Sequence, residues 1–270
     1  MNKDGTFTAA EKRPGTPFKG LPTPTVRTSE IPANAFRPSP DKIAQLPGID
    51  LANHHCMPWS KLRAGWNALS AKRLGDDPAQ SKTAIEISKL WLMCGGISEE
   101  AALGYLEMMA RQAMMGDTGD ILAQAICWFP HNLVTGPKED SRVDDPGDED
   151  FDCFCYIPGQ VARCQWVDKV YETFKVTLDA THLDILKDAF TTLSSEKLTA
   201  PTAFDVRYWV LAAYPHGYNP KDGKYHEEWG GKPLWQKRSL HGGDLPYLQG
   251  TVFVASKGGD MFERRQGGRK

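Results

Sequence analysis

The stretch DLANHHCMPWSKLRAGW, residues 50–66, sets three chemically reactive side chains directly before a helical pattern. His54, His55 and Cys56 are adjacent, and Pro58 follows them closely. Beyond the proline, apolar side chains recur at intervals of three and four residues, at Trp59, Leu62, Trp66 and Leu69. This spacing predicts a helix with one buried and one solvated face. The histidines and the thiol either form a reactive site or cap and anchor that helix.

Similar patterns continue on the C-terminal side of this stretch. Asp77 and Pro78 combine a capping residue with a proline at the first helical position, and Gly95 and Gly96 end the helix that they open. Ser98 caps a further helix, expected to run through Met115, and Thr118 begins a fourth, which ends at Pro130. Helical spacing returns at residues 161–174, 183–193 and 203–213, and a strand is expected at residues 251–255. We therefore predict a mainly α fold, a helical globular core with a small C-terminal α+β section.

Composition limits the class of protein. The chain has 270 residues, 40% of them apolar, and a formal net charge of -2. It has no apolar run long enough to span a bilayer, and its first residues lack the apolar segment of a signal peptide. We expect a globular protein that is cytoplasmic as synthesised, in which any attraction for nucleic acid is local.

The chain divides into three parts. Residues 1–47 hold eight of the nineteen prolines and few large apolar side chains, so we expect a disordered linker or docking arm there. Residues 48–214 form the predicted helical domain, and residues 131–158 within it form an acidic loop. Residues 215–270, rich in glycine, aromatic and basic side chains, are expected to pack on the same domain.

The six cysteines allow more than one interpretation. Several lie on apolar helical faces, where reduced cysteine behaves as a small hydrophobic residue. Cys153, Cys155 and Cys164 form a tighter group that could hold a metal or a disulfide. The redox state of these three thiols stays open.

Two short stretches resemble the active-site motif of HNH-type nucleases. His54 and His55 with Pro58 match its His-His-x-x-Pro spacing, and Asn132 with Leu133 resembles its Asn-Leu element. In that family the two elements lie on adjoining strands of a hairpin, whereas here helices fill the interval between them. Such domains occur often in toxins that bacteria deliver into competing cells.

The resemblance implies roles for particular residues. His55 would be the general base, Asn132 would orient it, and His54 would position the metal or the substrate. Asp144 and Asp145 offer hard oxygen ligands for a magnesium-type divalent cation, although an acidic run is also typical of a solvated loop. Arg142 would contact a phosphate.

Cys56 suggests a different chemistry. A thiol directly before a helix lies at the positive end of the helix dipole, which stabilises the thiolate. With a histidine from elsewhere in the chain, Cys56 could be the nucleophile of an amidase or peptidase. The alternative is a buried thiol that anchors the helix.

The C-terminal section also admits two interpretations. Lys237 and Arg238 follow several tryptophans and tyrosines, a mixture that can stack on bases and hold phosphates. Interleaved acidic residues favour ordinary packing with solvated lysines instead.

Together these features favour a metal-dependent nuclease, a toxin or effector domain that acts on nucleic acid. A cysteine-dependent hydrolase is the first alternative. The second is a non-enzymatic binding protein, an adaptor or an immunity-type partner. The Pro-rich arm is where an immunity or delivery protein would bind.

Overall fold

The computed structural model describes residues 1–8, 11–16, 25–26, 49–113, 118–142, 178–196, 198, 201, 204, 209–213, 218–219, 224–225, 234–237, 251–254 and 263–266. The helix predicted at residues 161–174 lies outside these ranges, as do Cys153, Cys155, Cys164 and most of the acidic loop.

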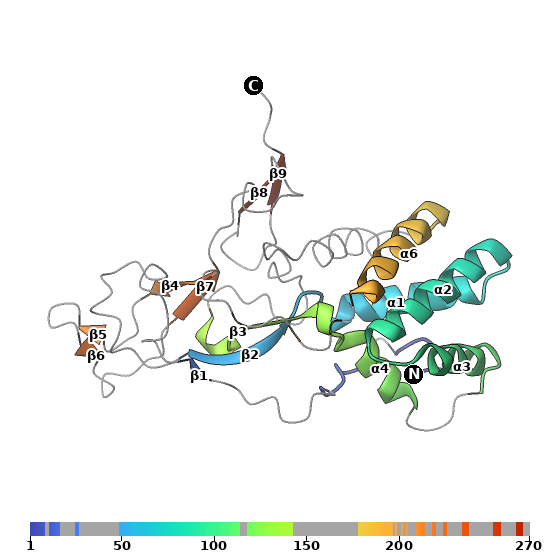
Figure 1. Ribbon diagram of the computed structural model, residues 1–270, viewed down its shortest axis with the longest axis horizontal. Coiled ribbons are helices and arrows are strands. Elements are labelled where there is room, and N and C mark those ends of the chain that lie inside the picture. The colour runs from blue at the N-terminus through green and yellow to red at the C-terminus, as the bar shows by residue number, and fades with distance from the viewer. Residues whose placement is uncertain are drawn as a thin grey trace.

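Helices form the core of the described chain. They are α1 (Trp59–Arg73), α2 (Pro78–Cys94), α3 (Glu99–Ala110), α4 (Thr118–Cys127) and α6 (Ala180–Ser195). Helix α2 is central, because α1, α3, α4 and α6 all pack against it (Figure 1). The prediction of a mainly α fold is confirmed. None of the described helices is long and apolar enough to cross a membrane.

Side-chain caps define where α2, α3 and α6 begin. The Asp77 carboxylate accepts hydrogen bonds from the main-chain N–H groups of Ala79 and Gln80, at the start of α2. Ser98 caps α3 in the same way. Helix α3 ends at Ala110, earlier than predicted, and Gln112 has a φ of 55°, a left-handed conformation that a right-handed helix cannot continue.

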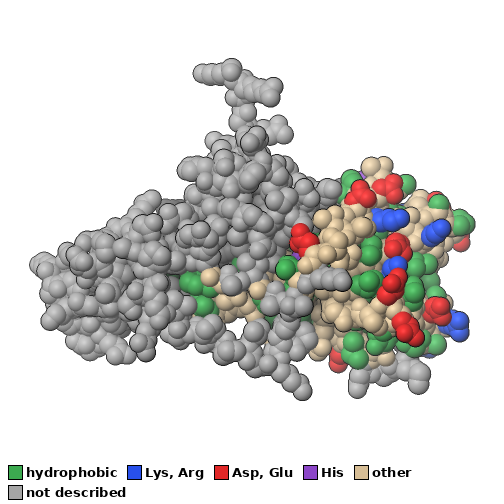
Figure 2. Space-filling model, in the orientation of Figure 1, with side chains coloured by type: hydrophobic (Ala, Val, Ile, Leu, Met, Phe, Trp, Pro, Cys, Tyr) green, Lys and Arg blue, Asp and Glu red, His purple; other side chains and the backbone are tan. Residues whose placement is uncertain are grey.

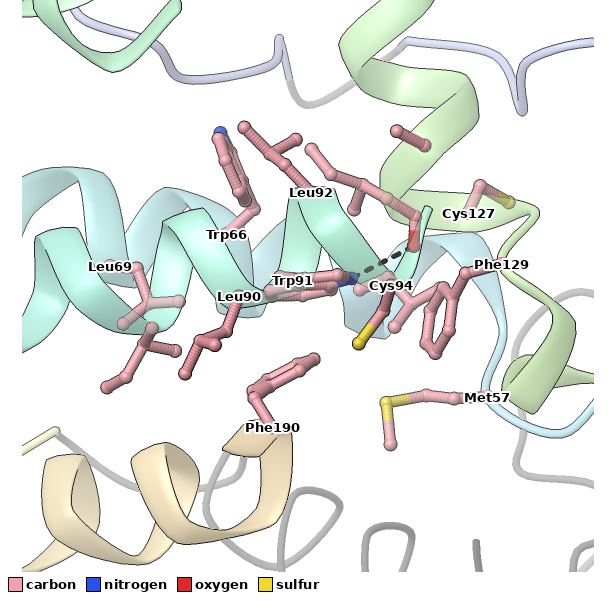
Figure 3. Packing of buried hydrophobic residues seen from close by; sticks show 14 of the residues in the cluster. Met57, Trp66, Leu69, Leu90, Trp91, Leu92, Cys94, Cys127, Phe129 and Phe190 are labelled. Atoms are coloured by element: carbon pink, nitrogen blue, oxygen red, sulfur yellow. Dashed lines mark hydrogen bonds between the residues drawn. The ribbon is translucent and has the colours of Figure 1, made fainter. Parts of the chain in front are cut away.

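Aromatic side chains join the helices around α2. Trp91 meets Trp66 of α1 edge-on at 5.7 Å between ring centroids and stacks on Phe190 of α6 at 4.9 Å. Its indole N–H also donates to the Ile126 carbonyl of α4, the dashed line in Figure 3. Burying an aromatic ring of this size contributes about 1.5–3 kcal/mol. One side chain thus fixes three helices to α2.

A small antiparallel sheet adjoins this core. Its order is β1 (Thr25–Val26), β2 (Ile49–His55) and β3 (Leu133–Pro137). Short 3-10 helices, η4 (Pro130–Asn132) and η5 (Glu139–Ser141), flank β3. The sheet therefore pairs β2, which precedes α1, with β3, which follows α4.

The remaining strands form two-stranded pairs. Strand β4 (Trp209–Ala213) pairs with β7 (Leu234–Lys237), and β5 (Tyr218–Asn219) with β6 (Lys224–Tyr225). Strand β8 (Thr251–Val254) pairs with β9 (Glu263–Gln266), which confirms the predicted strand. The helix predicted at residues 203–213 is wrong for β4, because cross-strand pairing with β7 overrides a weak helical pattern rich in β-favouring residues.

The beginning of the chain lies on the helical core. Phe7 is only 3% exposed and meets Trp59 edge-on at 5.0 Å between ring centroids. The described part of residues 1–16 therefore differs from the loose arm expected from composition, because one aromatic anchor and many main-chain hydrogen bonds hold it. On the face in Figure 2, acidic and basic side chains are interspersed over the helical part.

Candidate functional site

Pairing of β2 with β3 brings the two motif elements together. His54 lies opposite Val134 and His55 lies opposite Leu133, and Asn132 directly precedes β3. In Figure 1 the two strands run side by side next to the helices. The elements that are distant in sequence thus lie on adjoining antiparallel strands.

The Asn132 side chain fastens this junction. It is fully buried, and its Oδ1 accepts from the Met57 N–H at 2.8 Å. Its Nδ2 donates to the carbonyls of Met57 and Cys127, both at 3.1 Å. The Cys56 N–H adds a hydrogen bond to the Asn132 carbonyl at 2.8 Å. Asn132 therefore positions the end of β2 through the main chain, and these bonds do not reach a histidine ring.

His54 lies on one side of β2 and contacts Arg142. Its Nε2 is 2.7 Å from the Pro137 carbonyl oxygen, so that nitrogen must carry the proton and donate. Its Nδ1 then accepts, and the Arg142 Nη1 donor lies 3.3 Å away. The hydrogen bond to Pro137 thus fixes both the tautomer and the orientation of the ring.

Arg142, which contacts His54, is itself held in place by its main chain. It is 5% exposed, and its main chain forms an isolated parallel bridge with that of Trp235 in β7. Trp235 is itself fully buried. The C-terminal section therefore helps to hold Arg142, whose guanidinium lies next to His54.

His55 lies on the other side of β2, as neighbouring residues of a strand do. Its Nε2 is 3.4 Å from the Cys127 Sγ, and its ring meets Trp128 edge-on at 4.2 Å between centroids. Burial, with smaller contributions from the charges of Arg13 and His54, lowers the pKa of His55 to about 3. His55 is therefore neutral at neutral pH.

The predicted site residues are only partly described. His54, His55, Asn132 and Arg142 gather at the β2–β3 pair, but His55 turns away from His54 and Arg142. Lys237 ends β7, and Asp144, Asp145 and Arg238 lie outside the described ranges. Among the residues that the structure describes, no group of three His, Cys, Asp or Glu side chains is arranged to hold a metal.

The cysteines differ from the expected reactive pattern. Cys56 is fully buried, so it is not the exposed thiol that was expected at the start of α1. Cys94 and Cys127 are buried as predicted, and burial raises the pKa of Cys94 to about 12. The described thiol that contacts a histidine is Cys127, which the sequence did not single out.

Sequence reasoning missed Trp128 and Pro137, and it considered Trp235 only as one of the aromatic side chains that can stack on bases. Pro137 and Trp235 act through their main chains, which no side-chain motif reports. The stretch Leu133–Pro137 has a β-favouring start that could have predicted the strand.

Comparisons with known proteins give no relative for this chain: no family model matches it, and neither does any curated protein or solved structure.

Proposed function

We propose that this protein is a metal-dependent hydrolase that cleaves phosphodiester bonds in nucleic acid, with its catalytic site at His54 and Arg142. The observation that carries the proposal is the contact between these two side chains on the β2–β3 pair. Support also comes from the adjoining strands, which are what the resemblance to HNH-type nucleases implies.

The tautomer of His54 suits a general base. Because Nε2–H donates to the Pro137 carbonyl, the lone pair lies on Nδ1, next to the Arg142 guanidinium. A phosphate that draws the guanidinium toward it would leave Nδ1 facing the attacking water, and His54 would take a proton from that water. Arg142 would neutralise charge on the phosphate oxygens.

His54 is a better candidate for the base than His55. The lowered pKa of His55 makes its imidazole a weak proton acceptor, and its ring packs on Cys127 and Trp128. We propose that His55 has a positioning role, since it holds the end of β2 against α4 while His54 performs the proton transfer.

The cation ligands proposed are Asp144 and Asp145, which follow Arg142 and Val143 in the sequence. Carboxylates are the ligands that magnesium-type ions prefer. When bound, such a cation stabilises negative charge on the phosphate.

Cleavage of DNA and RNA by the purified full chain tests the proposal. We expect cleavage with magnesium or manganese, and none with excess chelator. Arg142→Ala should reduce the rate at least tenfold, and Arg142→Lys should restore part of it because the positive charge returns. Arg111→Ala is the matched control, since that arginine, directly after α3, is 78% exposed. Absence of cleavage with either substrate and any divalent cation would contradict the proposal.

A cysteine-dependent amidase or peptidase is a second candidate. It is favoured by the 3.4 Å contact between Cys127 and His55, and it would use Cys127 in place of the Cys56 suggested by sequence. Hydrolysis that survives chelation, persists in His54→Ala and disappears in Cys127→Ser would support this candidate over the nuclease.

A further inference from the structure

Cys127 and His55 form a thiol–imidazole pair on the side of β2 opposite the proposed catalytic site. The Cys127 Sγ lies 3.4 Å from the His55 Nε2. The Asn132 Nδ2 donates to the Cys127 carbonyl at 3.1 Å, which fixes the main chain that carries the thiol. In Figure 3 the Cys127 sulfur points away from Trp91. The position of the thiol is therefore set by the core, and its reactivity depends on what covers it.

Successive side chains cover this thiol. His55 lies on Cys127, and Trp128 meets the His55 ring edge-on at 4.2 Å between centroids. Arg13 lies over Trp128, with its guanidinium carbon 5.9 Å from the ring centroid. Exposure rises in the same order, because Cys127 is fully buried, His55 and Trp128 are half-buried, and Arg13 is exposed. The outermost layer of the cover thus comes from the N-terminal segment.

We name residues 11–16 the strap. At one end, the Glu11 carbonyl accepts hydrogen bonds from the Trp59 indole at 3.2 Å and from Arg63 at 3.3 Å, which join it to α1. Farther along, the Pro14 carbonyl accepts from the Trp128 indole N–H at 2.7 Å. The side chains between these two points are exposed. Exposed segments of this kind open locally at a small fraction of the free energy of global unfolding, so the strap can leave Trp128 while the helices stay folded.

The strap also acts on the pair through charge. Burial is the main cause of the lowered pKa of His55, and the positive charge of Arg13 lowers that pKa further. A neutral imidazole leaves the proton on the Cys127 sulfur, and an uncharged thiol is a poor nucleophile. Movement of the strap would admit water and remove the Arg13 charge. Both changes favour transfer of the thiol proton to the His55 Nε2.

We infer that the strap is a regulatory cover, which holds Trp128 over the Cys127–His55 pair and exposes the pair to small electrophiles when it moves away. The inference concerns access to the pair and does not rest on the metal-dependent chemistry proposed at His54. If Cys127 is a catalytic nucleophile, the strap is the element that inhibits it.

Alkylation of Cys127 in the native full chain tests this inference. Each variant is treated with iodoacetamide, and peptide mapping gives the labelling rates of Cys127 and of the buried Cys94. Arg13→Ala removes the cation over Trp128 and should speed the labelling of Cys127 by about two- to fivefold. Lys12→Ala is the matched control, since Lys12 is an exposed cation of the strap, and it should leave the rate unchanged.

A double variant shows whether Arg13 acts through Trp128. Trp128→Ala should speed the labelling of Cys127 by roughly tenfold or more, because a whole layer of the cover is lost. Adding Arg13→Ala to Trp128→Ala should then have no further effect. A wild-type rate in Arg13→Ala would overturn the inference. So would equal acceleration at Cys94, because the thiols would then be exposed by unfolding of the core.

The wild-type chain and Arg13→Ala decide the matter if Trp128→Ala loses its helices by circular dichroism. In urea below the unfolding transition, local opening of the strap should label Cys127 before Cys94, and earlier still in Arg13→Ala. Labelling of the two thiols at equal rates across the urea series would overturn the inference.

Discussion

Asn132 and Met57, 75 residues apart in sequence, exchange two hydrogen bonds: the Asn132 Oδ1 accepts from the Met57 N–H, and its Nδ2 donates to the Met57 carbonyl. The side-chain amide of Asn132 thus makes the same two hydrogen bonds that a residue of a neighbouring strand would make. The pair continues the β2–β3 ladder beyond His55 and joins it to the start of α1. The position of His54 therefore depends on a residue that its ring does not touch.

Removing the Asn132 side chain should destabilise the fold. Asn132→Ala leaves the Met57 N–H and two carbonyls buried without this partner, at a cost of about 2–4 kcal/mol. Asn53→Ala, on β2, is the control, because the partly buried Asn53 accepts one hydrogen bond from Thr135. We expect that change to cost about 1 kcal/mol or less. Urea unfolding measures both, and equal costs would contradict the role given to Asn132.

Two glycines should respond in opposite directions to alanine. A Cβ on Gly95 would lie 2.4 Å from the Ala125 carbonyl oxygen, so Gly95→Ala must push α4 away from α2. Gly104, on the exposed face of α3, has nothing within 4 Å of such a Cβ. Gly104→Ala should therefore stabilise the protein by about 0.5–1 kcal/mol through helix propensity. Thermal unfolding of the two variants gives the signs, and a neutral Gly95→Ala would contradict the close packing of α2 on α4.

Acid should weaken the fold through His55. The unfolded chain binds a proton at this residue below its ordinary pKa of 6.5, whereas the folded chain does so only near 3. Because the unfolded state binds more protons in that window, stability falls as the pH falls from 6.5 toward 3, by at most about 1.4 kcal/mol per pH unit. His55→Phe keeps a ring against Trp128 and should show a shallower slope. Parallel stability profiles for the two proteins would refute the neutral imidazole of His55.

The described thiols should resist alkylation in the native protein. Cys56, Cys94 and Cys127 are all buried, and the raised pKa of Cys94 disfavours its thiolate further. Peptide mapping after iodoacetamide treatment should find these three unmodified until denaturant is added. Rapid labelling of Cys56 in the native protein would contradict this prediction and support the reactive thiol that its position before α1 suggested.

The features that could be predicted depend on residues that are close together in the sequence. The Asp77–Pro78 start of α2, its end at Gly95 and the Ser98 cap of α3 each depend on residues a few positions apart. The pairing of β2 with β3 depends on contacts across the length of four helices, and sequence patterns do not report such contacts. For the same reason β4 was mistaken for a helix.

The candidate site was predictable in its residue types but not in its geometry. The histidine pair and Asn132 were visible as a motif, and Arg142 as a nearby cation. The side of β2 that each histidine occupies follows from strand register, which only the pairing with β3 fixes. Phe7 was overlooked because residues 1–47 were assessed by their average composition, which hides a single well-placed anchor.

The most direct test of the central claim compares His54 and His55 in one cleavage assay. Rates on DNA and RNA are measured with magnesium for the wild type, His54→Ala and His55→Phe, with folding checked by circular dichroism. We predict that His54→Ala loses about 10²- to 10⁴-fold in rate, as expected for a positioned base, while His55→Phe keeps most of its activity. Full activity in His54→Ala together with loss in His55→Phe would contradict the account.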